Sequence, residues 1–293
     1  MKTGINPKVD CVFKAIFGSE ENKDVLIHLL NAVLDPVPEH RIASVELLNP
    51  YNDRTFEDGK SSVVDIKAKD QMDRSLQIEI QIQAHPGLKE RMLWTWTDIY
   101  HRQLQAGQSY ELLNPTISIW FMDESLFKVK HQYHHCFAVM ERSRHEILSP
   151  HFNLHVIEMQ KWVSALKSGP QTKTNIDLWL KFLNYGQDLE SEALPPELRI
   201  PEIQKAMSTL TRFSQSDREH DLYMRRLERM SIENSWKEGV AKAERKAAME
   251  AKRAEKAEKE RDHEAVRAQK AESELAELKK ALAEAQKTQK SNL

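Results

Sequence analysis

The clearest pattern in the chain is an alternation of apolar and polar residues in two neighbouring segments. From 76 to 83, Leu, Ile, Ile and Ile alternate with Gln, Glu, Gln and Gln. From 64 to 69, Val, Ile and Ala alternate with Asp, Lys and Lys. A period of two predicts a β-strand with one buried and one polar face. We therefore predict strands over 62–69 and 75–83, joined by a turn centred on Met72.

Burial fixes the parity with which these two strands pair. A shift by one residue would set the apolar side chains of one strand against the polar side chains of the other. The favoured pairing places Asp65 opposite Glu79 and Lys67 opposite Gln77, with residue 63 opposite Gln81. Two carboxylates directly opposite each other repel, and a divalent cation that prefers oxygen ligands, such as Mg²⁺, reverses the sign of that interaction. The alternative is that both acids lie on a solvated face beside lysines.

Helices and further strands follow from spacing and from turn residues. Apolar residues at helical spacing predict helices over 7–17, 24–34 and 86–107, the first ending at Gly18. β-rich apolar runs predict strands over 42–48, 116–122, 135–140 and 154–159. Strands that enclose helices predict an α/β fold with a mixed sheet flanked by helices. We assign this core to residues 1–165 and a helical extension to residues 166–236.

The composition changes sharply after residue 236. Residues 237–293 contain 15 Lys or Arg, 12 Asp or Glu and 14 Ala, with one Gly and neither Pro nor aromatic residues. This composition, with Glu and Lys four residues apart, predicts a long, solvated single helix. Apolar residues spaced by four and three predict a short coiled coil at 271–285, and with it a homo-oligomer: Ala271, Leu275, Leu278, Leu282 and Ala285.

Charge and cysteine usage exclude several classes of protein. The formal net charge is −2, with −5 over residues 1–236 and +3 in the tail, so the chain is not a basic nucleic-acid wrapper. A polyanionic partner must meet a local basic patch. Cys11 and Cys136 form no disulfide framework, and no apolar run resembles a signal peptide or a membrane span. We expect a cytoplasmic protein without a membrane partner.

Histidines gather in two stretches of the core. The first holds His131, His134, His135 and Cys136, and the second holds His151 and His155, spaced by four. Because we predict strands or loops for both stretches, the spacing of His151 and His155 does not place them on one helical face. The four-ligand pattern of a structural zinc site is absent, so we predict no zinc site here.

The acidic hairpin resembles the metal-binding hairpin of the PD-(D/E)xK nuclease superfamily. The pattern D-x13-E-x-Q, in the context VVDIKAKD and LQIEIQIQ, is most similar to the bacterial recombination-promoting nuclease and putative transposase family. The flanking segments NPKVDCVFKAIFG, YHRQLQAGQSY and PTISIWFMD agree in order and spacing. The resemblance covers about residues 1–190, and the tail beginning WKEGVAKAE is similar to the degenerate repeats that end many such proteins.

The resemblance implies a restriction-endonuclease-like core that cleaves DNA with Mg²⁺ (or Mn²⁺). By position, Asp65 and Glu79 are the metal ligands, and Asp10 matches the family's N-terminal acid, a further ligand. Gln81 stands where the superfamily has a lysine that orients the attacking water, but glutamine carries no positive charge. Lys67, on the same strand face, is our candidate for the missing charge. The alternative for Lys67 is an ordinary exposed strand lysine.

Basic and aromatic side chains on two predicted helices, and Tyr110 just after the second, supply candidate DNA contacts: Lys14, Arg91, Tyr100, Arg102 and Tyr110. Cations neutralise phosphates, and aromatic faces stack on bases. Helix packing against the sheet explains the aromatic residues equally. Two other functions stay open, a catalytically degenerate module that binds DNA or oligomerises, and a nuclease in a defence system that acts on RNA or single strands.

Overall fold

A computed structural model describes residues 2–49, 64–167 and 174–291. The predicted pairing of residue 63 lies outside this part of the chain. Six strands form one sheet in the order β1-β2-β3-β4-β6-β5. Their bounds are β1 Val45–Leu48, β2 Ile66–Asp70, β3 Ser75–Gln81, β4 Thr116–Met122, β5 His134–Phe137 and β6 Phe152–Glu158. The β3–β4 and β4–β6 pairs are parallel and the others antiparallel, so the predicted mixed sheet is confirmed.

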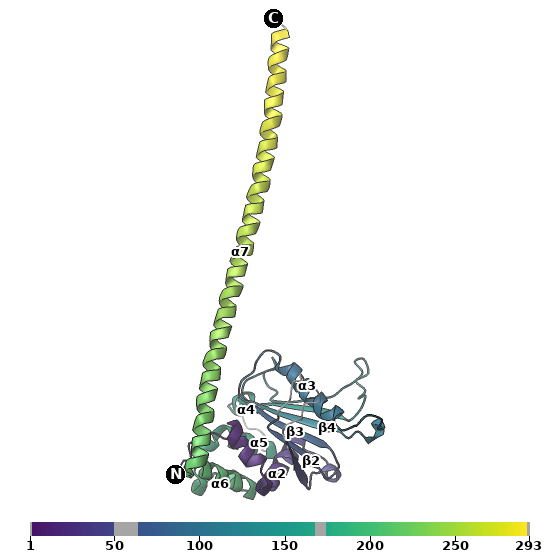
Figure 1. Cartoon of the computed structure of the whole chain (residues 1–293), viewed down its shortest axis with the longest axis vertical. Coiled ribbons are helices and arrows are strands. Elements are labelled where there is room, and N and C mark those ends of the chain that lie inside the picture. The colour runs from purple at the N-terminus through teal and green to yellow at the C-terminus, as the bar shows by residue number, and fades with distance from the viewer. Residues whose placement is uncertain (1, 50–63, 168–173, 292–293) are drawn as a thin grey trace. The chain divides into compact units, whose positions relative to one another are not determined.

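Helices cover both faces of this sheet, with α3 on one side and α2, α5 and α6 on the other (Figure 1). Their bounds are α1 Asp10–Phe17, α2 Lys23–Leu34, α3 Leu88–His101, α4 Met159–Leu166, α5 Asn175–Tyr185, α6 Pro201–Gln215 and α7 Asp217–Ser291. Short 3-10 turns lie at 20–22, 38–40, 110–112, 186–188, 191–193 and 196–198. Helix α4 was not predicted, because it begins directly after β6 with no turn residue and no side-chain cap to mark its start.

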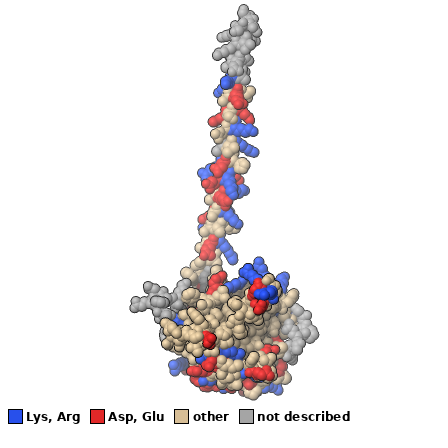
Figure 2. Space-filling model, turned by 90° about the vertical axis from the view of Figure 1, so that its right-hand side faces the viewer, with Lys and Arg blue, Asp and Glu red and all other residues tan. Residues whose placement is uncertain are grey.

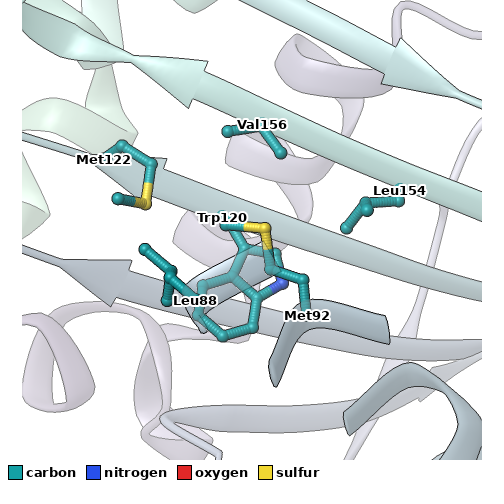
Figure 3. Close-up of a cluster of buried hydrophobic side chains, with 6 residues drawn as sticks. All are labelled: Leu88, Met92, Trp120, Met122, Leu154 and Val156. Atoms are coloured by element: carbon teal, nitrogen blue, oxygen red, sulfur yellow. The ribbon is translucent and has the colours of Figure 1, made fainter. Parts of the chain in front are cut away.

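An apolar cluster holds α3 against the sheet (Figure 3). Leu88 and Met92 of α3 pack on alternate side chains of two strands, Trp120 and Met122 of β4 and Leu154 and Val156 of β6. Alternate residues of a strand share a face, so Ile119 and Phe121 of β4 point to the opposite side.

Helix α1 packs on that opposite face through aromatic rings. The ring centroids of Phe13 and Phe121 are 6.1 Å apart, and those of Phe17 and Trp179 of α5 are 5.2 Å apart. A Cβ atom at Gly18 would lie 2.9 Å from the Lys14 carbonyl oxygen and 3.3 Å from an Ile66 side-chain carbon. A side chain at this position would collide with the last turn of α1 and press on Ile66 of β2, so glycine is favoured here.

The chain divides into two compact units, Met1–Leu227 and Glu228–Leu293. Helices α5 and α6, from the predicted helical extension, lie in the first unit with the sheet. None of the helices in the described ranges is both long and apolar enough to cross a membrane.

The second unit is a helix whose described side chains from residue 251 onward are all exposed, as the sequence predicts for a solvated helix. Acidic and basic side chains alternate along it (Figure 2), and Lys259 Nζ lies 2.7 Å from Glu255 Oε1. Leu275 and Leu278 are also exposed. The side chains of Leu282 and Ala285 lie outside the described residues, so the coiled coil at 271–285 stays a prediction.

Candidate active site

The β2–β3 hairpin has the predicted pairing. Ile66 lies opposite Ile78 and Lys67 opposite Gln77, and the next pair in this register is Asp65 and Glu79. The backbone N–H of Asp65 donates to Glu79 Oε1 at 3.2 Å. In return, Asp65 Oδ2 accepts from the backbone N–H of Ile80 at 3.0 Å. Each acid is thus anchored to the backbone of the opposite strand, and the two carboxylates meet at the end of the hairpin.

The face that carries Glu79 is buried, not solvated. Gln77 is 0 % exposed and Glu79 is 2 % exposed, because α3 and Trp120 cover this part of β3. The prediction that only one face of this strand is buried was therefore wrong for β3. The same finding removes the alternative in which the Glu79 carboxylate is an ordinary surface charge.

Burial also changes the charge state of this pair. Desolvation, and then the neighbouring Asp65, raise the pKa of Glu79 to about 8, although Arg91 acts in the opposite direction. One of the two adjacent carboxyls therefore holds a proton at neutral pH, because the site has too little positive charge to stabilise two carboxylates. A divalent cation bound by both carboxylates would remove that deficit, and carboxylate oxygen is the donor that Mg²⁺ and Mn²⁺ prefer. The two acids fit such an ion.

Two cations flank the acids. Lys14 Nζ of α1 lies 3.1 Å from Asp65 Oδ1, and Arg91 Nη2 of α3 lies 3.6 Å from Glu79 Oε2. Burial opposes the charge on Lys14, but Asp65, followed by Asp10 and Glu79, raises its pKa. Lys14 was predicted as a DNA contact, and the structure brings it directly to the carboxylate pair.

Arg91 joins Glu79 to Gln81. Its Nη1 donates to Gln81 Oε1 at 3.3 Å, and its guanidinium lies over the Trp120 ring, 5.4 Å from the centroid. The Gln81 amide nitrogen donates to the Gln83 carbonyl oxygen at 2.9 Å, which fixes the orientation of the amide. A fixed positive charge therefore lies beside the glutamine that cannot supply one. The sequence singled out Arg91 only as a DNA contact.

Asp10 takes part in a different contact. Its Oδ1 accepts from Arg226 Nε at 2.8 Å and from the backbone N–H of Cys11 at 2.8 Å. Arg226 belongs to the first turns of α7, so this ion pair ties the beginning of that helix to α1. The role of Asp10 as a third metal ligand stays a prediction.

Three residues that were predicted to contact DNA make no described contact with Asp65 or Glu79. The Tyr100 hydroxyl lies 2.9 Å from His151 Nδ1, and Arg102 Nε lies 2.7 Å from Asp98 Oδ1. Tyr100 lies in the last turn of α3 and Arg102 directly after it. This end of α3 lies near the start of β4, where Trp96 Nε1 donates to the Thr116 carbonyl oxygen, whereas Glu79 pairs with Trp120 in the middle of that strand. Tyr110 is 83 % exposed at the start of the 3-10 turn at 110–112.

Comparison with known families agrees with this geometry. A family model described as PD-(D/E)XK nuclease family transposase matches residues 7–240, a range that includes the hairpin, α1 and α3. Searches of curated proteins and of solved structures gave no match. The family model covers most of the chain and supports a nuclease or transposase-like function. The chain therefore belongs to the PD-(D/E)XK nuclease family transposases.

Proposed function

We propose that the protein is a Mg²⁺- or Mn²⁺-dependent endodeoxyribonuclease that hydrolyses phosphodiester bonds and promotes DNA recombination. The observation that carries the proposal is the cross-strand pair of Asp65 and the buried Glu79, flanked by Lys14 and Arg91. Family membership supports a nuclease. The carboxylate pair supports the metal, and the cations support a polyanionic substrate.

Asp65 and Glu79 would hold the ion. When bound, such an ion acidifies a coordinated water and offsets the negative charge that develops on phosphorus. The carboxylates lie on opposite strands of one hairpin and are anchored by backbone N–H groups, so their separation is fixed before an ion binds. Fixed ligands reduce the reorganisation that catalysis requires.

The remaining side chains have separate roles in this proposal. Arg91 stabilises the charge on the transition-state phosphoryl oxygens, in place of the lysine that the superfamily has at the position of Gln81. Gln81 orients the attacking water through its amide, which Arg91 and the Gln83 carbonyl hold in place. Lys14 binds a non-bridging oxygen of the same phosphate. Lys67 lies on the adjacent strand at the level of Gln77 and is the alternative source of positive charge.

Cleavage of supercoiled plasmid tests this proposal. The full chain is incubated with plasmid in Mg²⁺, Mn²⁺, Ca²⁺ or EDTA, beside Asp65→Asn and Glu79→Gln. We expect nicked or linear products in Mg²⁺ or Mn²⁺, none in EDTA, and none from either variant. Cleavage that persists in both variants would assign the activity to another site or to a contaminant. Parallel reactions on single-stranded DNA and on RNA distinguish an endodeoxyribonuclease from a nuclease that acts on RNA or single strands.

Gln81 favours one second candidate, a core that binds DNA without cleaving it. If Arg91 cannot replace the missing lysine, the acids and cations remain but catalysis is lost. Binding to duplex DNA that weakens steeply with salt, without metal-dependent cleavage of any substrate, would support that function.

A further inference from the structure

Three ligand-type side chains meet at the other end of the sheet. His134 and Cys136 are alternate residues of the edge strand β5, so their side chains share one face. His155 of β6 is the direct partner of Cys136 in the antiparallel register. The two histidines are 21 residues apart in the sequence, and strand pairing brings them together.

The distances between the donor atoms match those around a tetrahedral metal ion. His134 Nε2 lies 3.0 Å from His155 Nδ1, and Cys136 Sγ lies 3.6 Å and 3.4 Å from these nitrogens. With zinc–nitrogen bonds of about 2.0–2.1 Å and a zinc–sulfur bond of about 2.3 Å, a tetrahedron separates two nitrogens by about 3.4 Å and nitrogen from sulfur by about 3.6 Å. Every pair of donors is within about 0.4 Å of that geometry.

We propose that His134 Nε2, Cys136 Sγ and His155 Nδ1 bind a Zn²⁺ ion, with water as the fourth ligand. Two imidazoles and a thiolate select zinc over Mg²⁺, which takes oxygen donors. Cys136 is exposed, so solvent reaches the remaining position of the tetrahedron. The proposal departs from the prediction of no zinc site, which rested on the missing four-ligand pattern, since three donors from two strands suffice when water completes the set.

This site is separate from the acidic pair. His155 pairs with Ile119 of β4, whereas Glu79 pairs with Trp120. Adjacent residues of one strand point to opposite faces, so the two sites lie on opposite sides of the sheet. The proposed zinc site does not rest on the proposed nuclease activity.

The alternative is a direct hydrogen bond between the two histidines. Their nitrogens are 3.0 Å apart, and one neutral imidazole can donate to the other without an ion. Burial lowers the pKa of both rings, that of His155 to about 4, so both are neutral, as hydrogen bonding and metal binding alike require. A hydrogen bond between the rings gives no reason for Cys136 Sγ to lie within 3.6 Å of both nitrogens.

The ion would fasten a short edge strand. Strand β5 has four residues and pairs only with β6 within the described sheet. On its other face His135 Nε2 lies 2.7 Å from Glu158 Oε2, which also contacts Lys161 Nζ. Zinc on one face and this buried charge network on the other would hold β5 from both sides.

Metal binding by the full chain tests the proposal. The protein is stripped with a chelator, dialysed against Zn²⁺, and its zinc content is measured by mass spectrometry. A second sample is loaded with Co²⁺, whose near-ultraviolet thiolate charge-transfer band and intense visible bands report a tetrahedral site with a cysteine ligand. The variants are Cys136→Ser, His134→Ala and His155→Ala. Cys11→Ser and His131→Ala are the matched controls, and circular dichroism checks that each variant is folded.

We expect the wild type to bind one more zinc ion per chain than Cys136→Ser. The cobalt thiolate band should be present in the wild type and in both controls, Cys11→Ser and His131→Ala. Each of the three ligand variants loses that band. If one ligand variant does not fold, the other two still decide the outcome. The proposal is wrong if the wild type shows no thiolate band, if the band survives Cys136→Ser, or if Cys11→Ser removes it. Zinc that binds equally to wild type and Cys136→Ser belongs to another site, such as the carboxylates.

Discussion

The β2–β3 and β5–β6 strand pairs use the same geometry with different chemistry. In both, ligand-type side chains face each other across antiparallel strands. The first pair presents carboxylates beneath α3, where burial and mutual repulsion raise the pKa of Glu79 to about 8. The second presents neutral imidazoles and a thiol at an exposed edge. Strand pairing thus decides which side chains meet, and the donor atoms decide which ion fits.

Cover by a helix is the second difference between the pairs. Arg91 of α3 and Lys14 of α1 bring fixed positive charge to the acids. The described side-chain hydrogen bonds of His134, Cys136 and His155 are made within the cluster itself. A site that must bind a phosphate needs such cations, whereas a site that only fastens two strands does not.

The largest expected effects are losses of activity or of metal binding that are confined to one of the two sites. Glu79→Gln should lower plasmid cleavage by at least about 100-fold, since it removes a ligand of the ion that stabilises the transition state. It should leave the cobalt thiolate band unchanged. Cys136→Ser should abolish that band and leave the cleavage rate in Mg²⁺ within about threefold of wild type. A variant that removes both signals would show that the sites are coupled.

Arg91 and Lys67 can be distinguished next. We expect Arg91→Gln to lower cleavage by about 10- to 100-fold, in the range of losing one transition-state donor, and Lys67→Gln by less than about threefold. Because Arg91 also holds down the pKa of Glu79, its removal should move the rise of activity to higher pH. Initial rates across a pH series measure both effects. A larger loss with Lys67→Gln would transfer the charge role to that residue.

The stability of the metal-free protein should fall as the pH rises. The folded pKa of Glu79 lies above its ordinary value of 4.5, so between about pH 4.5 and 8 the folded state holds more protons than the unfolded state. Stability is then greatest below this window and is lost through it, by about 5 kcal/mol. Urea unfolding in EDTA at several pH values measures the slope. Glu79→Gln should flatten it, and equal slopes in both proteins would contradict the raised pKa.

The smallest expected effect is on thermal unfolding. Saturating Zn²⁺ should raise the midpoint by about 3 °C, because binding to the folded state adds free energy and a unit of this size gains about 2–4 °C per kcal/mol. Differential scanning calorimetry with and without Zn²⁺ measures the shift. No shift is expected for His155→Ala, and an equal shift there would place the stabilising ion elsewhere.

Much of the fold could be predicted because its signals are local. The strict alternation around Glu79 set both the strand and its parity, and the apolar run of 116–122 coincides with β4. The turn centred on Met72 gave the register. Helix α4 was not predicted because β6 ends at Glu158 and the helix begins at the next residue, with no turn residue or side-chain cap between them.

The parts of the sites that could not be predicted depend on long-range packing. The role of Arg91 required knowing which face of α3 meets β3, and exposed Leu93 and Trp94 obscure the amphipathic pattern of that helix. The predicted strand over 135–140 left out His134, which lies in β5. The spacing of His134 and Cys136 by two was a usable signal, but their partner His155 follows only from the pairing of β5 with β6.

The charged helix of the second unit has a mechanical consequence. Its residues from Glu228 to Ser291 rise about 1.5 Å each, which gives about 95 Å between the two ends of this segment. A flexible coil of the same length would have a root-mean-square span of only about 45 Å. Anything attached at the C-terminal end is therefore held at a long and narrowly distributed distance from residue 228. The helix behaves as a spacer, and it keeps the local concentration of such an attachment near that residue low.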